Sequence, residues 1–84
     1  MKWTVIYRPD AADDLVDIWV DAPDRQAIAD AANHIDTLLG IDPLSAGESR
    51  EVNSRVVCDG PLTVFFDVNV DDRMVIVWHV VTSG

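Results

Sequence analysis

The hydrophobic pattern changes its period twice along the chain, and this change constrains the fold more than any other feature of the sequence. Residues 2–8 are rich in β-forming side chains that alternate between two faces, as in a strand. Apolar residues then recur at helical spacing in two stretches, 11–22 and 28–39. Three further segments rich in β-branched residues follow at 50–58, 62–70 and 73–81. The sequence therefore predicts the element order β-α-α-β-β-β.

Aspartate and glycine mark the ends of the two predicted helices. Asp10 and Asp24 each follow a proline, and each is predicted to cap the helix that comes after it. Gly40 stands where a left-handed residue often ends a helix, and the segment 41–47 is predicted to be a loop. Two amphipathic helices with so short a connection predict an antiparallel hairpin.

The last two predicted strands differ in how many apolar faces they have. The segment 62–70 has one, formed by Leu62, Val64, Phe66, Val68 and Val70. The segment 73–81 has two, with Val75, Val77, His79 and Val81 on one face and Met74, Ile76, Trp78 and Val80 on the other. A strand of this kind is usually central and covered twice, and the second cover could be another chain. The predicted class is α+β, with a helical hairpin packed on one face of a mostly antiparallel sheet.

Acidic residues outnumber basic residues by 15 to 6, which gives a formal net charge of -9. Such a field repels the phosphates of free nucleic acid and favours basic partners or solubility. The single cysteine, Cys58, cannot form an internal disulfide, and the start of the chain does not resemble a signal peptide. The longest apolar run, 74–78, is too short to span a bilayer. These features predict one cytoplasmic domain over residues 1–84.

The predicted elements resemble those of the RelE/ParE toxin superfamily, which includes plasmid-stabilisation and type II toxin–antitoxin proteins. The first strand and helix carry the resemblance in Trp3-Thr-Val-Ile-Tyr-Arg-Pro9 and Ala11-x-x-Asp14-Leu15-x-x-Ile18-Trp19. The second helix carries it in Ala31-Ala32-x-x-Ile35-Asp36-x-Leu38-Leu39, followed by Pro43 and Gly47. The last two strands carry it in 62–68 and 71–77. The resemblance covers essentially the whole chain and implies the same fold.

The resemblance also implies where catalytic residues are expected. The RelE branch cleaves mRNA on the ribosome without a metal, and its basic residues act on the scissile phosphate and the attacking hydroxyl. Arg55 matches one basic position of the family, but Thr63 stands where the family has an arginine. The segment 81–84, Val-Thr-Ser-Gly, stands where the family carries a reactive tail. We therefore expect the inherited catalytic set to be incomplete.

Two further candidate residues for catalysis lie in the last predicted strand. His79 could serve as an acid or base with Glu51 and Asp67 as partners, but its apolar neighbours favour a core or interface histidine. Arg73, at the start of that strand, is the other candidate. His34 is predicted to be a residue of the helix surface.

The aspartates of the first helix raise the question of a metal. Asp13 and Asp17 are four residues apart, but a stripe on one helix encloses a cation poorly, so we interpret it as a solvated face. No metal site and no cofactor is predicted.

Four functions remain open. The first is a toxin component that binds an antitoxin, with its catalytic set incomplete. The others are an active ribosome-dependent mRNA endonuclease, a ParE-like gyrase inhibitor, and a degenerate toxin fold reused as a binding module or homodimer. In this family the antitoxin adds a helix and a strand to the toxin. Three apolar residues of the last strand are the predicted partner-binding residues: Trp78, Met74 and Val80.

Overall fold

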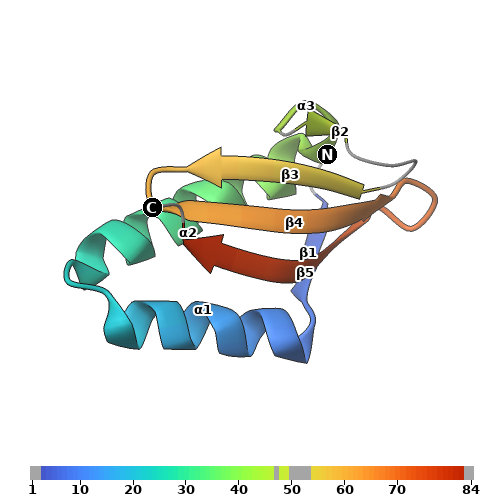
Figure 1. The fold of residues 1–84 in the computed structure, drawn as a ribbon. Helices are drawn as coiled ribbons and strands as arrows, with labels where there is room; N and C mark the ends of the chain where they lie inside the picture. The colour runs from blue at the N-terminus through green and yellow to red at the C-terminus, as the bar shows by residue number, and fades with distance from the viewer. Residues whose placement is uncertain (1–2, 47, 50–53, 83–84) are drawn as a thin grey trace.

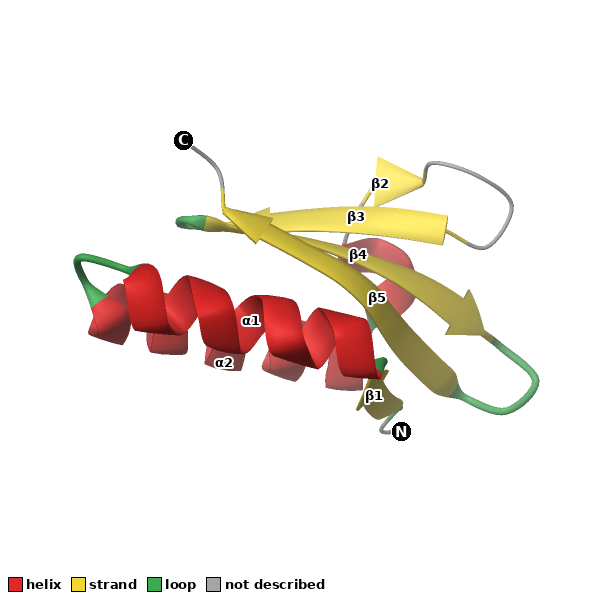
Figure 2. Cartoon of the chain, turned by 60° about the horizontal axis from the view of Figure 1, so that its bottom comes forward, coloured by secondary structure: helices red, strands yellow, loops and turns green. Residues whose placement is uncertain are grey.

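The chain forms two layers, a five-stranded sheet and a pair of helices that cover one of its faces (Figures 1 and 2). The computed structural model describes residues 3–46, 48–49 and 54–82. Its elements are β1 (Thr4–Tyr7), α1 (Pro9–Asp21), α2 (Arg25–Ile41), α3 (Pro43–Ala46), β2 (Glu48–Ser49), β3 (Ser54–Asp59), β4 (Leu62–Asn69) and β5 (Met74–Thr82). The predicted α+β class and the hairpin on one face of the sheet are confirmed.

The strands lie in the order β1-β5-β4-β3-β2, and all neighbours are antiparallel except β1 and β5. β5 therefore lies inside the sheet, as its two apolar faces predict. β1 pairs only with the first part of β5, from Thr4↔Met74 to Tyr7↔Val77. The Arg8 N–H donates one more bond to the Val77 carbonyl, at 2.9 Å. The chain then turns into α1, which packs against β5.

The core lies between the sheet and the helical hairpin. The helices contribute Ala11, Ile28, Ala31, Ile35 and Leu39, and the strands contribute Val57, Leu62, Val64, Phe66, Val68, Val75, Val77 and Val80. Four residues of β4 alternate toward the helices as predicted. Val70 does not continue this face, because β4 ends at Asn69 and Val70 lies in the following turn, 58% exposed.

A β-bulge corrects the predicted faces of β5. Phe65 of β4 pairs with His79, but the next residue, Phe66, pairs with Val77, so Trp78 is the extra residue. The alternation therefore changes phase at Trp78. Val80 turns into the core, 2% exposed, and the prediction that it shares a face with Trp78 is wrong. His79 likewise leaves the face of Val77.

One of the predicted helix-end residues has its predicted role, and two do not. Asp24 caps α2, since its side chain accepts from the Ala27 N–H at 3.2 Å. Asp10 does not cap α1, because that helix already begins at Pro9, whose fixed φ suits a first helical residue, and Asp10 lies in its first turn. α2 continues through Gly40 to Ile41 and ends at Asp42, so the prediction of a left-handed end at Gly40 is wrong.

The segment predicted as a loop at 41–47 contains the single helical turn α3, which starts at Pro43. The strand predicted at 50–58 is observed as β3, Ser54–Asp59, while residues 50–53 lie outside the described part of the chain. Gly60 makes the turn into β4 with a φ of 55°, which only glycine adopts without strain. No helix within the described residues is long and apolar enough to cross a membrane.

Candidate functional site

Three aromatic rings gather on the outer face of the sheet, the face opposite the helices. Phe65 lies 5.4 Å from Trp78 and 5.6 Å from His79, measured between ring centroids, and the Trp78 and His79 rings stack at 6.0 Å. The bulge explains this grouping, because it places two adjacent residues of β5 opposite one residue of β4. Trp78 remains 37% exposed. We call Phe65, Trp78 and His79 the aromatic cluster.

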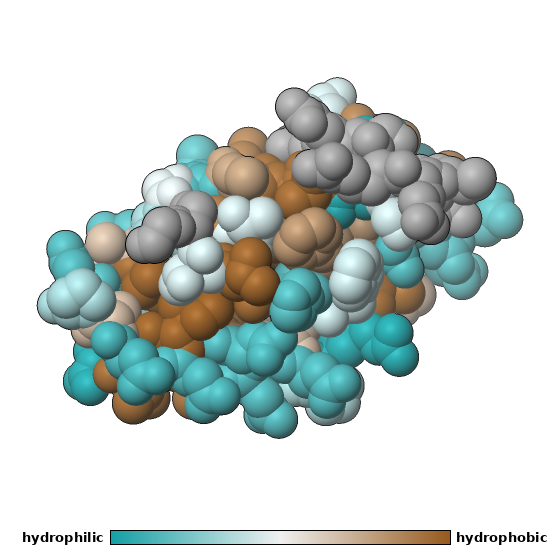
Figure 3. Space-filling view, in the orientation of Figure 1, coloured by the Kyte–Doolittle hydropathy of each residue, from teal (hydrophilic) through white to brown (hydrophobic). Residues whose placement is uncertain are grey.

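Apolar surface also lies on this side of the molecule. Figure 3 views the same face, and brown hydrophobic surface extends over the region between the end of β5 and α1. The register places Met74 and Ile76 on the outer face as well, beside Thr4 and Ile6 of β1. Of the three predicted partner-binding residues, Trp78 and Met74 therefore lie on the outer face, whereas Val80 does not.

His79 is held by a carboxylate that the sequence did not single out as its partner. Its Nδ1 lies 3.2 Å from Oδ2 of Asp14 in α1, and the two side chains are 45% and 40% exposed. Asp14 reaches His79 because α1, rather than a longer β1, lies beside this part of β5. The carboxylate fixes the orientation of the half-exposed imidazole ring. An ion pair so exposed contributes at most about 1 kcal/mol to stability.

The residues predicted to partner His79 are occupied elsewhere or not described. Asp67 accepts a hydrogen bond from the Ser54 hydroxyl at 2.6 Å. Glu51 lies outside the described residues.

The other two catalytic candidates do not converge on His79. Arg55 pairs with Phe66, which faces the helices, so the Arg55 side chain lies on the face of the sheet opposite His79. Arg73 lies in the turn before β5, where its guanidinium sits 5.6 Å from the Trp3 ring centroid. Six residues along the strand separate it from His79, roughly 20 Å at about 3.3 Å per residue. The three candidates form no single site.

Thr63 also lies on the outer face, where it pairs with Val81 and Cys58. Its hydroxyl is 3.4 Å from the Cys58 sulfur, a neutral contact at the position where the resemblance implies an arginine. A threonine cannot offer a forked positive charge to a phosphate. Ser83 and Gly84, in the predicted position of the reactive tail, lie outside the described residues.

Two further polar pairs tie α2 to the sheet, and sequence reasoning missed both. His34, predicted as a helix-surface residue, is exposed and pairs with Asp59 at the end of β3. The Tyr7 hydroxyl donates to Asp36 at 2.5 Å. Burial raises the pKa of Tyr7 above its usual range, and the hydrogen bond and negative charge of Asp36 raise it further. A separation of 29 residues leaves no local pattern that could reveal this pair.

The aspartates predicted to form a solvated face, Asp13 and Asp17, are exposed on α1. Within the described ranges, no group of three or more His, Cys, Asp or Glu side chains could hold a metal ion.

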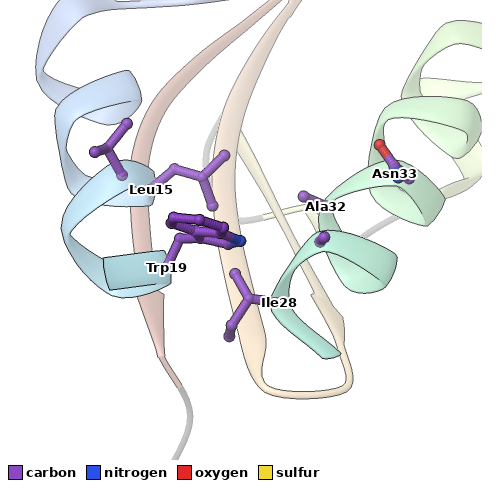
Figure 4. Close-up of a pocket in the computed structure, with 7 residues that line it drawn as sticks. Leu15, Trp19, Ile28, Ala32 and Asn33 are labelled. Carbon is purple, nitrogen blue, oxygen red and sulfur yellow. The ribbon is translucent and has the colours of Figure 1, made fainter. Parts of the chain in front are cut away.

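A second apolar surface lies on the helical hairpin, away from the sheet. Trp19, one of the apolar residues that recur at helical spacing in 11–22, is 42% exposed, and its side chain points from α1 toward α2 (Figure 4). The reason is its angle on the helix, which places it beside the core stripe of Ala11, Ile18 and Ala22. Trp19 lines a groove of about 250 Å³ between the two helices.

Comparison with known proteins identifies the fold. No protein-family model matches the sequence, and no curated protein matches it. Solved structures match over the whole chain. A chain of the RelBE2 toxin–antitoxin complex of Mycobacterium tuberculosis superposes with a TM-score of 0.80 at 16% identity, covering 99% of this chain and 100% of that one.

Two further structures are similar. For a chain of the chromosomal ParDE system of P. aeruginosa the TM-score is 0.75 at 17% identity, over 99% of this chain and 98% of the other. For the isolated RelE toxin of E. coli the TM-score is 0.69 at 10% identity, over 98% of this chain and 85% of the other. The chain therefore has the fold of the RelE and ParE toxins, which confirms the fold that the sequence resemblance implies.

Proposed function

We propose that this chain is a divergent RelE/ParE member, the toxin-type component of a type II toxin–antitoxin module, which binds an antitoxin and lacks an intact ribonuclease site. The observation that carries the proposal is the full-length fold match, because it includes chains from toxin–antitoxin complexes of both the RelE and the ParE type. The proposal places the protein in the cytoplasm as one domain over residues 1–84.

The arrangement of the candidate residues supports the proposal that the chain lacks ribonuclease activity. Ribonuclease chemistry without a metal needs a base, an acid and cations around one phosphate. Here Arg55 and His79 lie on opposite faces of the sheet, and Arg73 lies near the other end of β5. The net charge of -9 also opposes binding of RNA.

The outer face of the sheet supports partner binding. Trp78 of the aromatic cluster lies there, as does Met74, and exposed tryptophans are frequent anchors of protein interfaces. A partner that covers this face would also supply the second cover that the sequence of β5 predicts.

Co-expression with any small open reading frame found adjacent to the gene tests the proposal. We expect a complex that stays intact in size-exclusion chromatography, and weaker association when Trp78→Ala removes the exposed indole of the aromatic cluster. A chain that elutes alone in every case contradicts antitoxin binding.

A second candidate is ParE-like inhibition of gyrase. The match to a chain of a ParDE system favours it, because the ParE branch does not rely on the RelE catalytic residues. A supercoiling assay distinguishes it: inhibition by the purified chain supports this candidate, and unchanged supercoiling removes it.

A further inference from the structure

An exposed apolar strip on α1 borders the groove between α1 and α2. Val16, Trp19 and Val20 are 58%, 42% and 51% exposed, and they follow one another at helical spacing on the side away from the sheet. Single exposed apolar residues are ordinary, but a contiguous strip marks an interaction surface. This strip is separate from the aromatic cluster, because the hairpin packs with its other side on the opposite face of the sheet.

Small side chains on α2 leave the groove open. Leu15 and Ile28 line it near the core, and Trp19 reaches into it from α1 (Figure 4). Across from Trp19, α2 offers Ala29 and Ala32, which fill little space. The lining residues of both helices recur at three and four positions, the spacing at which a third helix docks its own i, i+3, i+4 and i+7 residues.

Most of the charges on the two helices that form the groove are negative. α1 contains five aspartates and α2 contains two, while Arg25 is the only lysine or arginine in either helix. Helical spacing places Asp13 and Asp17 beside the exposed valines of α1, and both carboxylates are exposed. A cationic partner is attracted by this rim, and an acidic partner is repelled.

Arg25 already shows how a cation sits at the groove. Its guanidinium lies 4.7 Å from the Trp19 ring centroid and donates to the Val20 carbonyl at 3.2 Å. This cation–π contact is made within the chain, so Arg25 holds the Trp19 ring at the groove, and it offsets one of the seven aspartate charges of the two helices.

We propose that the α1–α2 groove docks an amphipathic helix of a partner protein whose polar face carries lysine and arginine. The apolar face of that helix packs on Val16, Trp19 and Ala29, and its cations face Asp13 and Asp17. The proposal rests on the proposed function only in requiring a protein partner. A second copy of this chain is the poorer occupant, because its own hairpin carries the same acidic rim.

Two designed peptides test the docking. Both are amphipathic helices with the same leucine face, and their polar faces carry either lysine or glutamate. We expect saturable binding of the lysine peptide, read by tryptophan fluorescence at physiological ionic strength, and at least about tenfold weaker binding of the glutamate peptide. Equal binding of the two peptides, or no binding of either, overturns the proposal.

Two matched variants separate docking in the groove from general attraction of a cation to an acidic protein. Val16→Asp and Val70→Asp each add one negative charge at a valine that is 58% exposed, in the groove and in the β4–β5 turn respectively. Charge alone predicts that both strengthen binding of the lysine peptide. Docking in the groove predicts that Val16→Asp weakens it by about tenfold or more while Val70→Asp does not. Equal behaviour of the two variants overturns the proposal, and circular dichroism checks that both are folded.

The natural partner gives a readout that separates this proposal from the proposed function. If a co-purifying partner is lost in Val16→Asp but kept in Val70→Asp, the groove proposal is supported. If the partner is kept equally in both variants, antitoxin binding stands and the groove proposal is overturned. If sedimentation shows a dimer that Val16→Asp converts to a monomer, the occupant is a second copy, which also overturns it.

Discussion

Trp78 and His79 are adjacent in the chain and yet point to the same side of the sheet. A regular strand would place them on opposite faces, and the bulge opposite Phe65 is what brings them together. Sequence periodicity could not predict this, because a bulge moves all later residues of a strand to the other face without changing composition. Trp78 and Val80 were predicted to share one face of the strand, but Trp78 is 37% exposed and Val80 is 2% exposed.

The pKa of Tyr7 can be predicted and measured on its own, because Tyr7 is the only tyrosine of the chain. Phenolate absorbance therefore reports Tyr7 alone. Because burial and Asp36 raise its pKa, we expect the folded protein to titrate above the ordinary value of about 10. Asp36→Ala removes the hydrogen bond and the charge and should lower the midpoint, while burial keeps it above that value. A midpoint near 10 in the wild type contradicts the pairing of Tyr7 with Asp36.

The sign of the linked effect on stability follows from the direction of that shift. The phenol loses its proton in the unfolded chain at a lower pH than in the folded chain. The stabilisation is therefore complete below a pH of about 10 and is lost as the pH rises further. Urea unfolding should show a steeper alkaline loss of stability in the wild type than in Tyr7→Phe. Parallel curves for the two proteins would contradict this linkage.

At the scale of elements, the order of helices and strands could be predicted because each element carries its own period. The alternation of Leu62, Val64 and Phe66 is local information, and so is the apolar stripe of α2. The parallel pairing of β1 with β5 and the Tyr7–Asp36 bond join residues far apart in sequence. No local pattern specifies such contacts, so these features of the fold and of the candidate site were not predicted.

The cap of α2 gives a prediction for this element. Asp24 satisfies the N–H of Ala27, one of the donors that a helix start leaves unpaired. Asp24→Ala is expected to lower the free energy of unfolding by about 1 kcal/mol. Asp17→Ala makes the same change in charge inside α1, without a cap, and should leave the stability within about 0.5 kcal/mol of wild type. Urea unfolding measures both variants, and equal effects would contradict the role of Asp24.

For the whole molecule, the fold is that of the RelE and ParE toxins, whereas the net charge argues against binding of RNA. The chain keeps the complete architecture of RelE and ParE toxins, yet its net charge is -9 and its candidate catalytic residues lie apart. A fold fixes where side chains can be presented, and the side chains determine the chemistry. Among the described residues, the chain presents an apolar surface at the aromatic cluster on the sheet and another at the groove on the hairpin.

The absence of ribonuclease activity is a prediction at this scale. Purified chain added to ribosomes that carry a defined mRNA is expected to leave the mRNA uncut, because the candidate cations Arg55 and Arg73 lie away from His79. Primer extension maps any cleavage, and an active RelE toxin serves as the positive control. Cleavage that Arg55→Ala abolishes would contradict the proposed function.

The central claim is that this fold serves to bind a protein partner, and affinity capture from the source cell tests it most directly. A tagged chain is captured, and the proteins bound to it are identified by mass spectrometry, with Trp78→Ala and Val16→Asp captured in parallel. The account predicts a small basic partner encoded beside the gene, recovered with the wild type and reduced in at least one variant. Recovery of no such partner would contradict the claim. Equal recovery with all three proteins would leave partner binding standing and contradict the roles given to Trp78 and Val16.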